Sequence, residues 1–162
     1  MRLYVMRHGP ADDQSPTGRD FDRALTPPGR EIVARVARAL QSARVGGPLR
    51  VLSSPFRRAR ETAEVVASVL TSLPAVPGVE IHDDLAADAE LPLGLVGALR
   101  EAGGDALLVG HQPIVEELVR VLIHPSRPSF PGGFRTATIV ALDAAPDDRF
   151  QLATTLDPYR LP

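Results

Sequence analysis

The chain contains no cysteine, no tryptophan and no lysine among its 162 residues. Without cysteine there can be no disulfide bond, no thiol nucleophile and no zinc site with cysteine ligands. No run approaches the roughly 20 apolar residues that a membrane-spanning helix needs. The N-terminus also lacks the charged and then apolar segments of a secretory signal, so the sequence predicts a cytoplasmic protein that does not bind membranes.

The remaining composition is that of an ordinary globular protein. Hydrophobic residues make up 44% of the chain, and the formal net charge is −2. This length suits a single domain over 1–162 with a sizeable core. Because there is no excess of positive charge, we expect no nucleic-acid partner. We expect the protein to be a monomer or a weak dimer.

Apolar runs that stop at glycine or proline alternate with segments of helical periodicity. The predicted strands cover 3–6, 49–52, 79–82, 106–109, 136–142 and 149–154. The predicted helices begin after two N-cap residues, Thr26 and Ser54, with Pro55 at the first helical position of the second helix. Two further helices begin at about Pro92 and at Pro113. This alternation predicts a three-layer α/β/α fold around a mainly parallel sheet. The last two strands could form an antiparallel hairpin around 145–148.

Two of the four histidines stand two positions after the last residue of a predicted strand, and each precedes a proline by two positions. His8 follows the first strand, and His111 follows the strand at 106–109. In open α/β sheets, chemistry takes place in the crevice beyond the carboxyl ends of the strands. If these two strands are neighbours, both imidazoles lie in one crevice together with the guanidinium of Arg7.

A histidine pair could also bind a metal ion, with a carboxylate from the acidic loop at 83–90 as a further ligand. A cation beside the pair, such as Arg7, disfavours that interpretation because it repels a metal ion. We therefore predict a site that holds no metal.

Three arginines, Arg57, Arg58 and Arg60, crowd the start of the second predicted helix. A cation there opposes the helix dipole at a cost of about a few tenths of a kcal/mol, so helix stability does not explain the cluster. Free N–H groups at a helix N-terminus together with a guanidinium can cradle a phosphate. The alternative is a solvated, arginine-rich helix face, which we favour for Arg57 and Arg60.

Several segments, taken in order, resemble the histidine phosphatase (phosphoglycerate-mutase-like) superfamily. They are Arg7-His8-Gly9, Arg23-x-Leu25-Thr26-x-x-Gly29, Ser54-x-Phe56-x-Arg58-Ala59-x-x-Thr62-Ala63 and Gly110-His111. The matching elements run from residue 3 to residue 113. Within the superfamily, the short length and the stretch at 53–62 most resemble the small SixA-type phosphohistidine phosphatases of bacteria.

The resemblance implies a role for each of four residues. His8 would be the nucleophile that attacks phosphorus and becomes a transient phosphohistidine. Arg7 and Arg58 would bind the phosphoryl oxygens, and His111 would donate a hydrogen bond to the same group. Phosphoryl transfer depends mainly on positioning and charge stabilisation, which two guanidiniums and an imidazole supply without a metal or other cofactor.

Larger members of the superfamily carry an acidic residue, on an insertion after the third strand, that protonates the leaving oxygen. Here that region is only the acidic loop, in which Asp88 and Glu90 are the candidates for a general acid and Asp84 is a weaker one. A solvated acidic loop explains these residues equally well. The sequence therefore leaves the general acid open.

The short acidic loop bears on the substrate. Without a general acid the leaving group must depart readily, as the nitrogen of phosphohistidine does once it is protonated. An uncovered pocket also suits a phosphorylated side chain on another protein better than an enclosed metabolite. The alternatives are a phosphatase of a small phosphoester and a non-catalytic module that binds phosphate or a phosphoprotein. Binding alone would need only the arginines, so His8 and His111 favour an enzyme.

The other candidates have structural explanations. We interpret His82, beside two aspartates, as hydrogen-bonded at a strand end, and His124 as a cap at the C-terminus of a helix. Strand propensity accounts for Thr136 and Thr138, although one of them could face the crevice.

Overall fold

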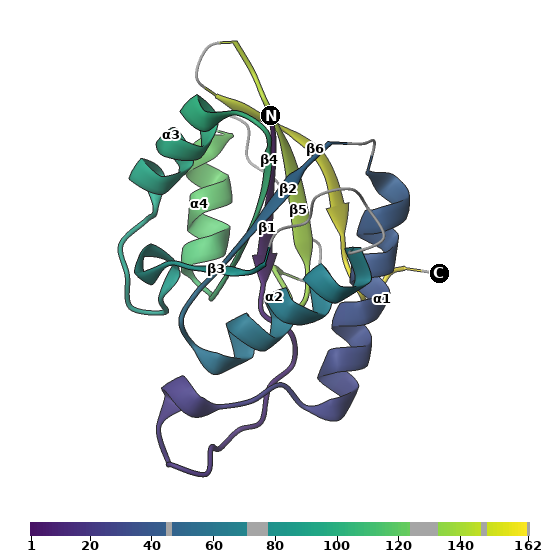
Figure 1. The fold of residues 1–162 in the computed structure, drawn as a ribbon, viewed down its shortest axis with the longest axis vertical. Helices are drawn as coiled ribbons and strands as arrows, with labels where there is room; N and C mark the ends of the chain where they lie inside the picture. The colour runs from purple at the N-terminus through teal and green to yellow at the C-terminus, as the bar shows by residue number, and fades with distance from the viewer. Residues whose placement is uncertain (45–46, 71–77, 124–132, 147–148, 162) are drawn as a thin grey trace.

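A six-stranded sheet forms the centre of the protein in this computed structural model, which describes residues 1–44, 47–70, 78–123, 133–146 and 149–161 (Figure 1). The strands are β1 (Arg2–Arg7), β2 (Leu49–Ser53), β3 (Glu80–Ile81), β4 (Asp105–Gly110), β5 (Ile139–Ala144) and β6 (Phe150–Leu156). Their order across the sheet is β3-β2-β4-β1-β5-β6. The first four are parallel to one another, and β5 and β6 are antiparallel to their neighbours. The predicted mainly parallel sheet, with an antiparallel pair at the end, is confirmed.

Helices cover both faces of this sheet. They are α1 (Pro27–Ala43), α2 (Arg57–Leu70), α3 (Leu93–Ala102) and α4 (Ile114–Leu122). Along β1, Tyr4 and Met6 pack into the cluster formed with α1 and α2, whereas Leu3 and Val5 pack into the cluster formed with α3 and α4. Successive side chains of a strand point to opposite faces, so a strand covered on both faces is apolar throughout. Figure 1 shows the two pairs of helices on opposite sides of the sheet.

The N-terminus of α1 is built against the turn that follows β1. Thr26 Oγ1 accepts a hydrogen bond of 3.0 Å from the Gly29 N–H, which is an N-cap as predicted, and Pro27 occupies the first helical position. A Cβ on Gly29 would lie 2.1 Å from the carbonyl oxygen of Pro10. Glycine at this position therefore lets the first turn of α1 pack directly on the backbone after β1.

Two predicted starts differ from the structure by two residues or more. The second helix begins at Arg57 and not at Pro55, because the Ser54 hydroxyl accepts the Phe56 N–H at 3.3 Å in a turn that precedes the helix. Strand β5 begins at Ile139 and not at residue 136. The backbone before it bends back to the end of β1, where the N–H of Ala137 donates to the carbonyls of Arg7 and His8 at 3.1 Å. The tip of the predicted hairpin, 147–148, lies outside the described residues.

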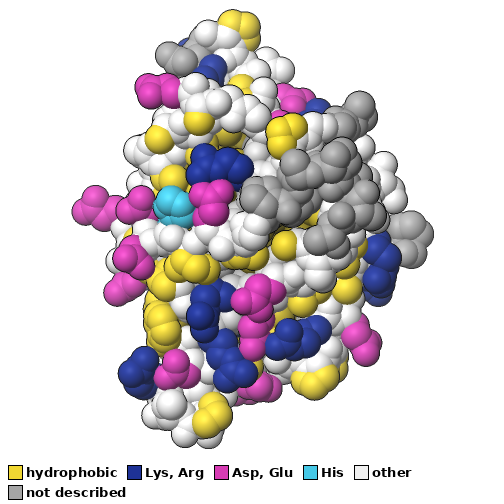
Figure 2. All heavy atoms as spheres, in the orientation of Figure 1, with side chains coloured by type: hydrophobic (Ala, Val, Ile, Leu, Met, Phe, Trp, Pro, Cys, Tyr) yellow, Lys and Arg dark blue, Asp and Glu magenta, His cyan; other side chains and the backbone are white. Residues whose placement is uncertain are grey.

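Charged side chains of both signs are spread over the surface. On the face shown in Figure 2, arginines and acidic residues are interspersed, in keeping with the small net charge of −2. Within the described part of the chain, every helix is too short or too polar to cross a membrane.

Candidate active site

Two histidines meet where β1 and β4 end. These strands are parallel neighbours, and their register pairs Arg7 with Gly110, so the residues that follow them emerge together. The backbone N–H of His8 donates to the Gly110 carbonyl at 3.0 Å. The ring centroids of His8 and His111 lie 5.1 Å apart, and their planes are inclined by 53°. The structure thus brings the two predicted histidines together.

The hydrogen bonds of His8 define which of its nitrogens carries the proton. Nδ1 lies 2.7 Å from the carbonyl oxygen of Gly9. A carbonyl only accepts hydrogen bonds, so Nδ1 is the protonated nitrogen and Nε2 keeps its lone pair. The Nε–H of Arg58 points at Nε2 from 3.3 Å. The unprotonated nitrogen of His8, Nε2, therefore faces Arg58.

Both imidazoles are neutral at physiological pH. Burial lowers the pKa of His8 to about 4; the hydrogen bond to Gly9 opposes this shift, and the guanidiniums of Arg58 and Arg7 add to it. Burial also lowers the pKa of His111 to about 3, with further contributions from His8 and Arg58. Desolvation and neighbouring cations both penalise a charged imidazole.

Arg58 is 5% exposed and is held by the loop between β1 and α1. Its Nη1 donates to the carbonyl of Asp20 at 2.8 Å, and its Nη2 donates to the carboxylate of Asp20 at 2.9 Å. The same carboxylate accepts from Arg23 at 2.8 Å, and the two guanidiniums hold the pKa of Asp20 below its usual value. Asp20 therefore orients Arg58 and is itself kept ionised.

Arg7, the last residue of β1, supplies a second guanidinium. Its Nη1 donates to the carbonyl of Phe134 at 3.1 Å, and burial lowers its pKa. Its Nε is buried and has no hydrogen-bond partner among the described residues. Arg7, Arg23 and Arg58 all disfavour protonation of His8. The field at the bare nitrogen is thus positive, which attracts an anion.

One hydroxyl ties the turn after β1 to α2. The Gly9 N–H donates to Thr62 Oγ1 at 3.0 Å, and Thr62 Oγ1 donates to the carbonyl of Arg58 at 2.6 Å. A Cβ on Gly9 would lie 2.5 Å from a methyl carbon of Val33, so the turn packs closely on α1 as well. These contacts fix His8 relative to Arg58, although the two residues are far apart in sequence.

The other side of His111 is formed by the turn before α2. Its Nε2 lies 2.8 Å from the hydroxyl of Ser54. The ring of Phe56 packs edge-on against His111 with centroids 5.0 Å apart, and Phe21 packs on Phe56 at 4.9 Å. The Nδ1 of His111 is buried and has no partner within the described residues.

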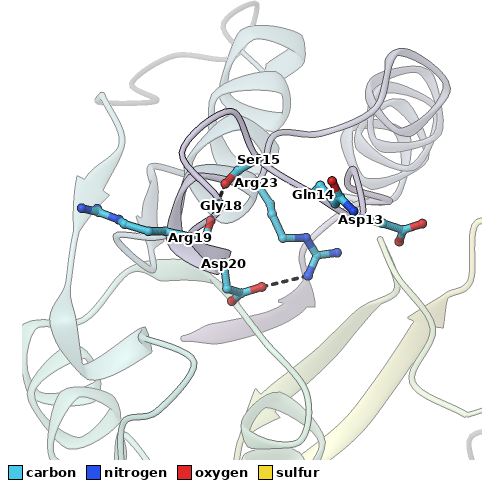
Figure 3. A pocket seen from close by; sticks show the side chains of 7 residues that line it. All are labelled: Asp13, Gln14, Ser15, Gly18, Arg19, Asp20 and Arg23. Carbon is cyan, nitrogen blue, oxygen red and sulfur yellow. Dashed lines mark hydrogen bonds and ion pairs between the residues drawn. The ribbon is translucent and has the colours of Figure 1, made fainter.

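A polar pocket adjoins the pair formed by Arg58 and Asp20. It has a volume of about 330 Å³ and is lined by Asp13, Gln14, Ser15, Gly18, Arg19, Asp20 and Arg23. Figure 3 shows Asp20 and Arg23 turned toward each other across it. Every residue of the lining belongs to the loop between β1 and α1, so this loop forms both the support of Arg58 and the adjoining pocket.

The acidic candidates are not bonded to the histidines and arginines in the described part of the chain. In the described part of the chain, neither Asp88 nor Glu90 makes a hydrogen bond or ion pair with Arg7, His8, Arg58 or His111. Both side chains are exposed. Asp84 and Glu90 line a smaller pocket of about 190 Å³ together with apolar residues and glycine.

Three of the remaining predicted residues have partners in the structure, whereas the buried hydroxyl of Thr138 has none among the described residues. The His82 ring lies 3.9 Å from the carboxylate of Glu80, and Arg57 pairs with Glu61 at 3.0 Å. The Thr136 hydroxyl lies 3.2 Å from that of Tyr159. His124 lies outside the described residues.

Sequence reasoning missed Asp20, and it assigned Ser54 only to a helix cap. Asp20 lies 38 positions before Arg58, in a polar loop that gives no local signal of the contact. Ser54 and Thr62 did carry a signal, because both stand in the motif around Arg58.

Solved structures share this fold. A structure of the protein histidine phosphatase SixA complexed with tungstate is 26% identical, has a TM-score of 0.83 and covers 98% of each chain. A structure of the ecdysone phosphate phosphatase from Bombix mori in complex with tungstate has a TM-score of 0.69 and covers 97% of this chain and 92% of the other. Its identity of 15% makes it a likeness of fold alone.

The sequence comparisons define the family. The model of the histidine phosphatase superfamily (branch 1) matches residues 3–86, which is more than half of the chain. The chain therefore belongs to the histidine phosphatase superfamily. An uncharacterized protein of Picosynechococcus sp. is 38% identical over 121 residues, which are 72% of this chain and 70% of the relative. Membership of the superfamily supports phosphatase activity.

Proposed function

We propose that the protein is a phosphatase in which Nε2 of His8 attacks phosphorus and forms a phosphohistidine intermediate. The observation that supports this proposal most directly is the protonation state of the His8 imidazole. Its Nδ1 is tied to the Gly9 carbonyl at 2.7 Å, and its bare Nε2 faces Arg58 at 3.3 Å. A neutral imidazole with a fixed tautomer is ready to act as a nucleophile without losing a proton first.

The rest of the cluster stabilises the charge of the transferred group. The Nε–H of Arg58 would donate to a phosphoryl oxygen in place of Nε2 of His8, while the two hydrogen bonds from its other nitrogens to Asp20 hold the guanidinium in place. Arg7 brings a buried Nε–H that has no partner in the described part of the chain. His111 would be a further donor to the same group. Preorganised donors of this kind are the main source of catalysis in phosphoryl transfer.

The reaction takes place in two displacements. In the first, the bond from Nε2 of His8 to phosphorus forms as the bond to the leaving group breaks, and the leaving atom takes up a proton from solvent. In the second, water attacks phosphorus and gives one proton back to solvent, the bond to His8 breaks, and hydrogen phosphate leaves with His8 again neutral. We propose that Arg7 and Arg58 supply the positive charge for both steps, so that no metal or other cofactor takes part.

We propose phosphohistidine in proteins as the substrate. This is supported by the likeness to SixA, which is described as a protein histidine phosphatase. It is also supported by Asp88 and Glu90, which are exposed and, among the described residues, make no hydrogen bond or ion pair with the cluster. A P–N bond breaks readily once its nitrogen is protonated, and water can provide that proton. With an ester substrate, Asp88 or Glu90 would have to reach the leaving oxygen as a general acid.

The second candidate is a small phosphoester with a polar leaving group. The observation that favours it is the pocket of about 330 Å³ lined in part by Asp20, the residue that binds Arg58. Its lining carries two arginines, two aspartates, a serine and a glutamine. Hydroxyl or carboxylate groups of a small substrate could pair with these side chains. The cytoplasmic location and the monomeric or weakly dimeric state expected from the sequence stay predictions.

The test is a comparison of kcat/KM on a histidine-phosphorylated protein with kcat/KM on a panel of sugar, nucleotide and glycerate phosphates. We expect the phosphoprotein to be hydrolysed most efficiently and the His8→Ala variant to be inactive on every substrate. A strong preference for one small ester would replace the first candidate by the second. If no compound turns over while phosphate still binds, the protein is a binding module and the proposal fails.

A further inference from the structure

The hydroxyl of Ser54 lies between His111 and the start of α2. Its Oγ is 2.8 Å from Nε2 of His111 and accepts the N–H of Phe56 at 3.3 Å. Ser54 is 0% exposed and His111 is 2% exposed, so water does not reach this contact from the surface. The direction of the Ser54–His111 hydrogen bond decides which nitrogen of His111 carries its proton.

Counting donors and acceptors gives that direction. A serine hydroxyl has one proton to donate and two lone pairs that accept. The Phe56 N–H takes one lone pair, and among the described residues the only acceptor within reach of the hydroxyl proton is Nε2 of His111. If Nε2 were protonated instead, the buried hydroxyl proton would have no partner, which native structures generally avoid.

We propose that Ser54 is a positioning residue that fixes His111 in the tautomer with its proton on Nδ1. Nδ1 is the buried nitrogen of His111 that has no partner in the described part of the chain. With the proton there, His111 would have an N–H left to donate to a phosphoryl group bound at His8, whose ring lies 5.1 Å away. This inference rests on the proposed function in one respect, since it takes a phosphoryl oxygen as the acceptor of that N–H.

The tautomer matters because His111 is neutral. Burial keeps its pKa far below physiological pH, so His111 cannot become a donor at both nitrogens by taking up a proton. In the opposite tautomer, Nδ1 would turn a lone pair toward the phosphoryl oxygens, and two acceptors repel each other. With its proton on Nδ1, His111 has the same tautomer as His8. The Gly9 carbonyl sets this tautomer in His8, and the Ser54 hydroxyl sets it in His111.

Nitrogen-15 NMR of the full chain tests the tautomer directly. Long-range proton–nitrogen correlations of the imidazoles, at pH 7, show which nitrogen of each ring is protonated. We expect Nδ1–H for His111 in the wild type and a shift toward Nε2–H in Ser54→Ala. The matched control is Ser53→Ala, which removes an equally buried neighbouring hydroxyl that donates to the Ser54 carbonyl at 2.9 Å and, among the described residues, makes no hydrogen bond to His111. Nε2–H in the wild type overturns the proposal, as does an unchanged His111 in Ser54→Ala.

Phosphate binding and turnover test the consequence. We expect Ser54→Ala to weaken inorganic phosphate binding and to lower kcat by about tenfold, the rate equivalent of one hydrogen bond. Ser54→Thr, which keeps the hydroxyl, should restore both the tautomer and kcat. Normal phosphate affinity and kcat in a Ser54→Ala protein whose tautomer has shifted would show that Ser54 positions nothing for the reaction. If the wild type binds phosphate but turns over no substrate, the proposed function fails. The NMR tautomer and the phosphate titration then still test whether Ser54 positions His111.

Discussion

Lowering the pH from 7 to 5 should destabilise the folded protein by about 4 kcal/mol, a loss that arises from the two buried histidines. The folded-state pKa values of His8 and His111 are about 4 and about 3. An imidazole in the unfolded chain has a pKa near 6.5. The unfolded chain therefore takes up protons first as the pH falls, so stability is full above about pH 6.5 and is lost progressively below it. At pH 5 this linkage amounts to roughly 2 kcal/mol for each histidine.

The assay is the free energy of unfolding in urea at pH 7, 6 and 5. The variants His8→Asn and His111→Gln should each remove about half of the pH dependence, and the double variant should remove nearly all of it. The quantity compared is the slope against pH and not the stability itself, because removing either ring also changes packing. Gln151→Ala, an exposed substitution on β6 that removes no titratable group, is the control and should keep the wild-type slope. A wild-type stability that is flat from pH 7 to 5, or a slope that survives in the double variant, would refute the reasoning.

Three further predictions concern the fold, the arginines and metals. Gly29→Ala should destabilise the protein by about 2–3 kcal/mol in chemical denaturation, because its Cβ would lie 2.1 Å from the Pro10 carbonyl oxygen; Gly97→Ala, in open space on a helix, should be neutral or slightly stabilising. Arg58→Lys should lower kcat/KM by about 10²–10³-fold, since an ammonium cannot make the guanidinium's separate hydrogen bonds, whereas Arg57→Lys should leave the rate near that of the wild type. Activity should persist in EDTA; a loss that a divalent metal restores would revive the histidine pair as a metal site.

The sheet could be predicted from sequence because its central strands are apolar throughout and end at glycine or proline. Residues 106–109 form one such run, which the structure buries on both faces as part of β4. Chemistry at the carboxyl ends of adjacent parallel strands then follows from topology. This is why His8 and His111, more than 100 positions apart in the chain, could be expected in one crevice.

The parts that could not be predicted depend on contacts between distant segments. The start of α2 is set by the hydroxyl of Ser54, which serves a turn and a histidine where the sequence suggested a helix cap. The start of β5 is set by Ala137, whose N–H bonds to the end of β1. Asp20 holds Arg58 from a loop without periodicity. The residues that neighbour Ser54, Ala137 and Asp20 in the sequence do not indicate which distant residue each of them contacts.

The measurement that tests the central claim most directly is a search for phosphate bound covalently to His8. The protein is mixed briefly with a labelled phosphodonor, quenched in acid or in base, and digested for mass spectrometry. The account predicts an adduct that is stable in base, labile in acid, located on His8 and absent from His8→Ala. Turnover without any adduct, or an adduct on another residue, would contradict it.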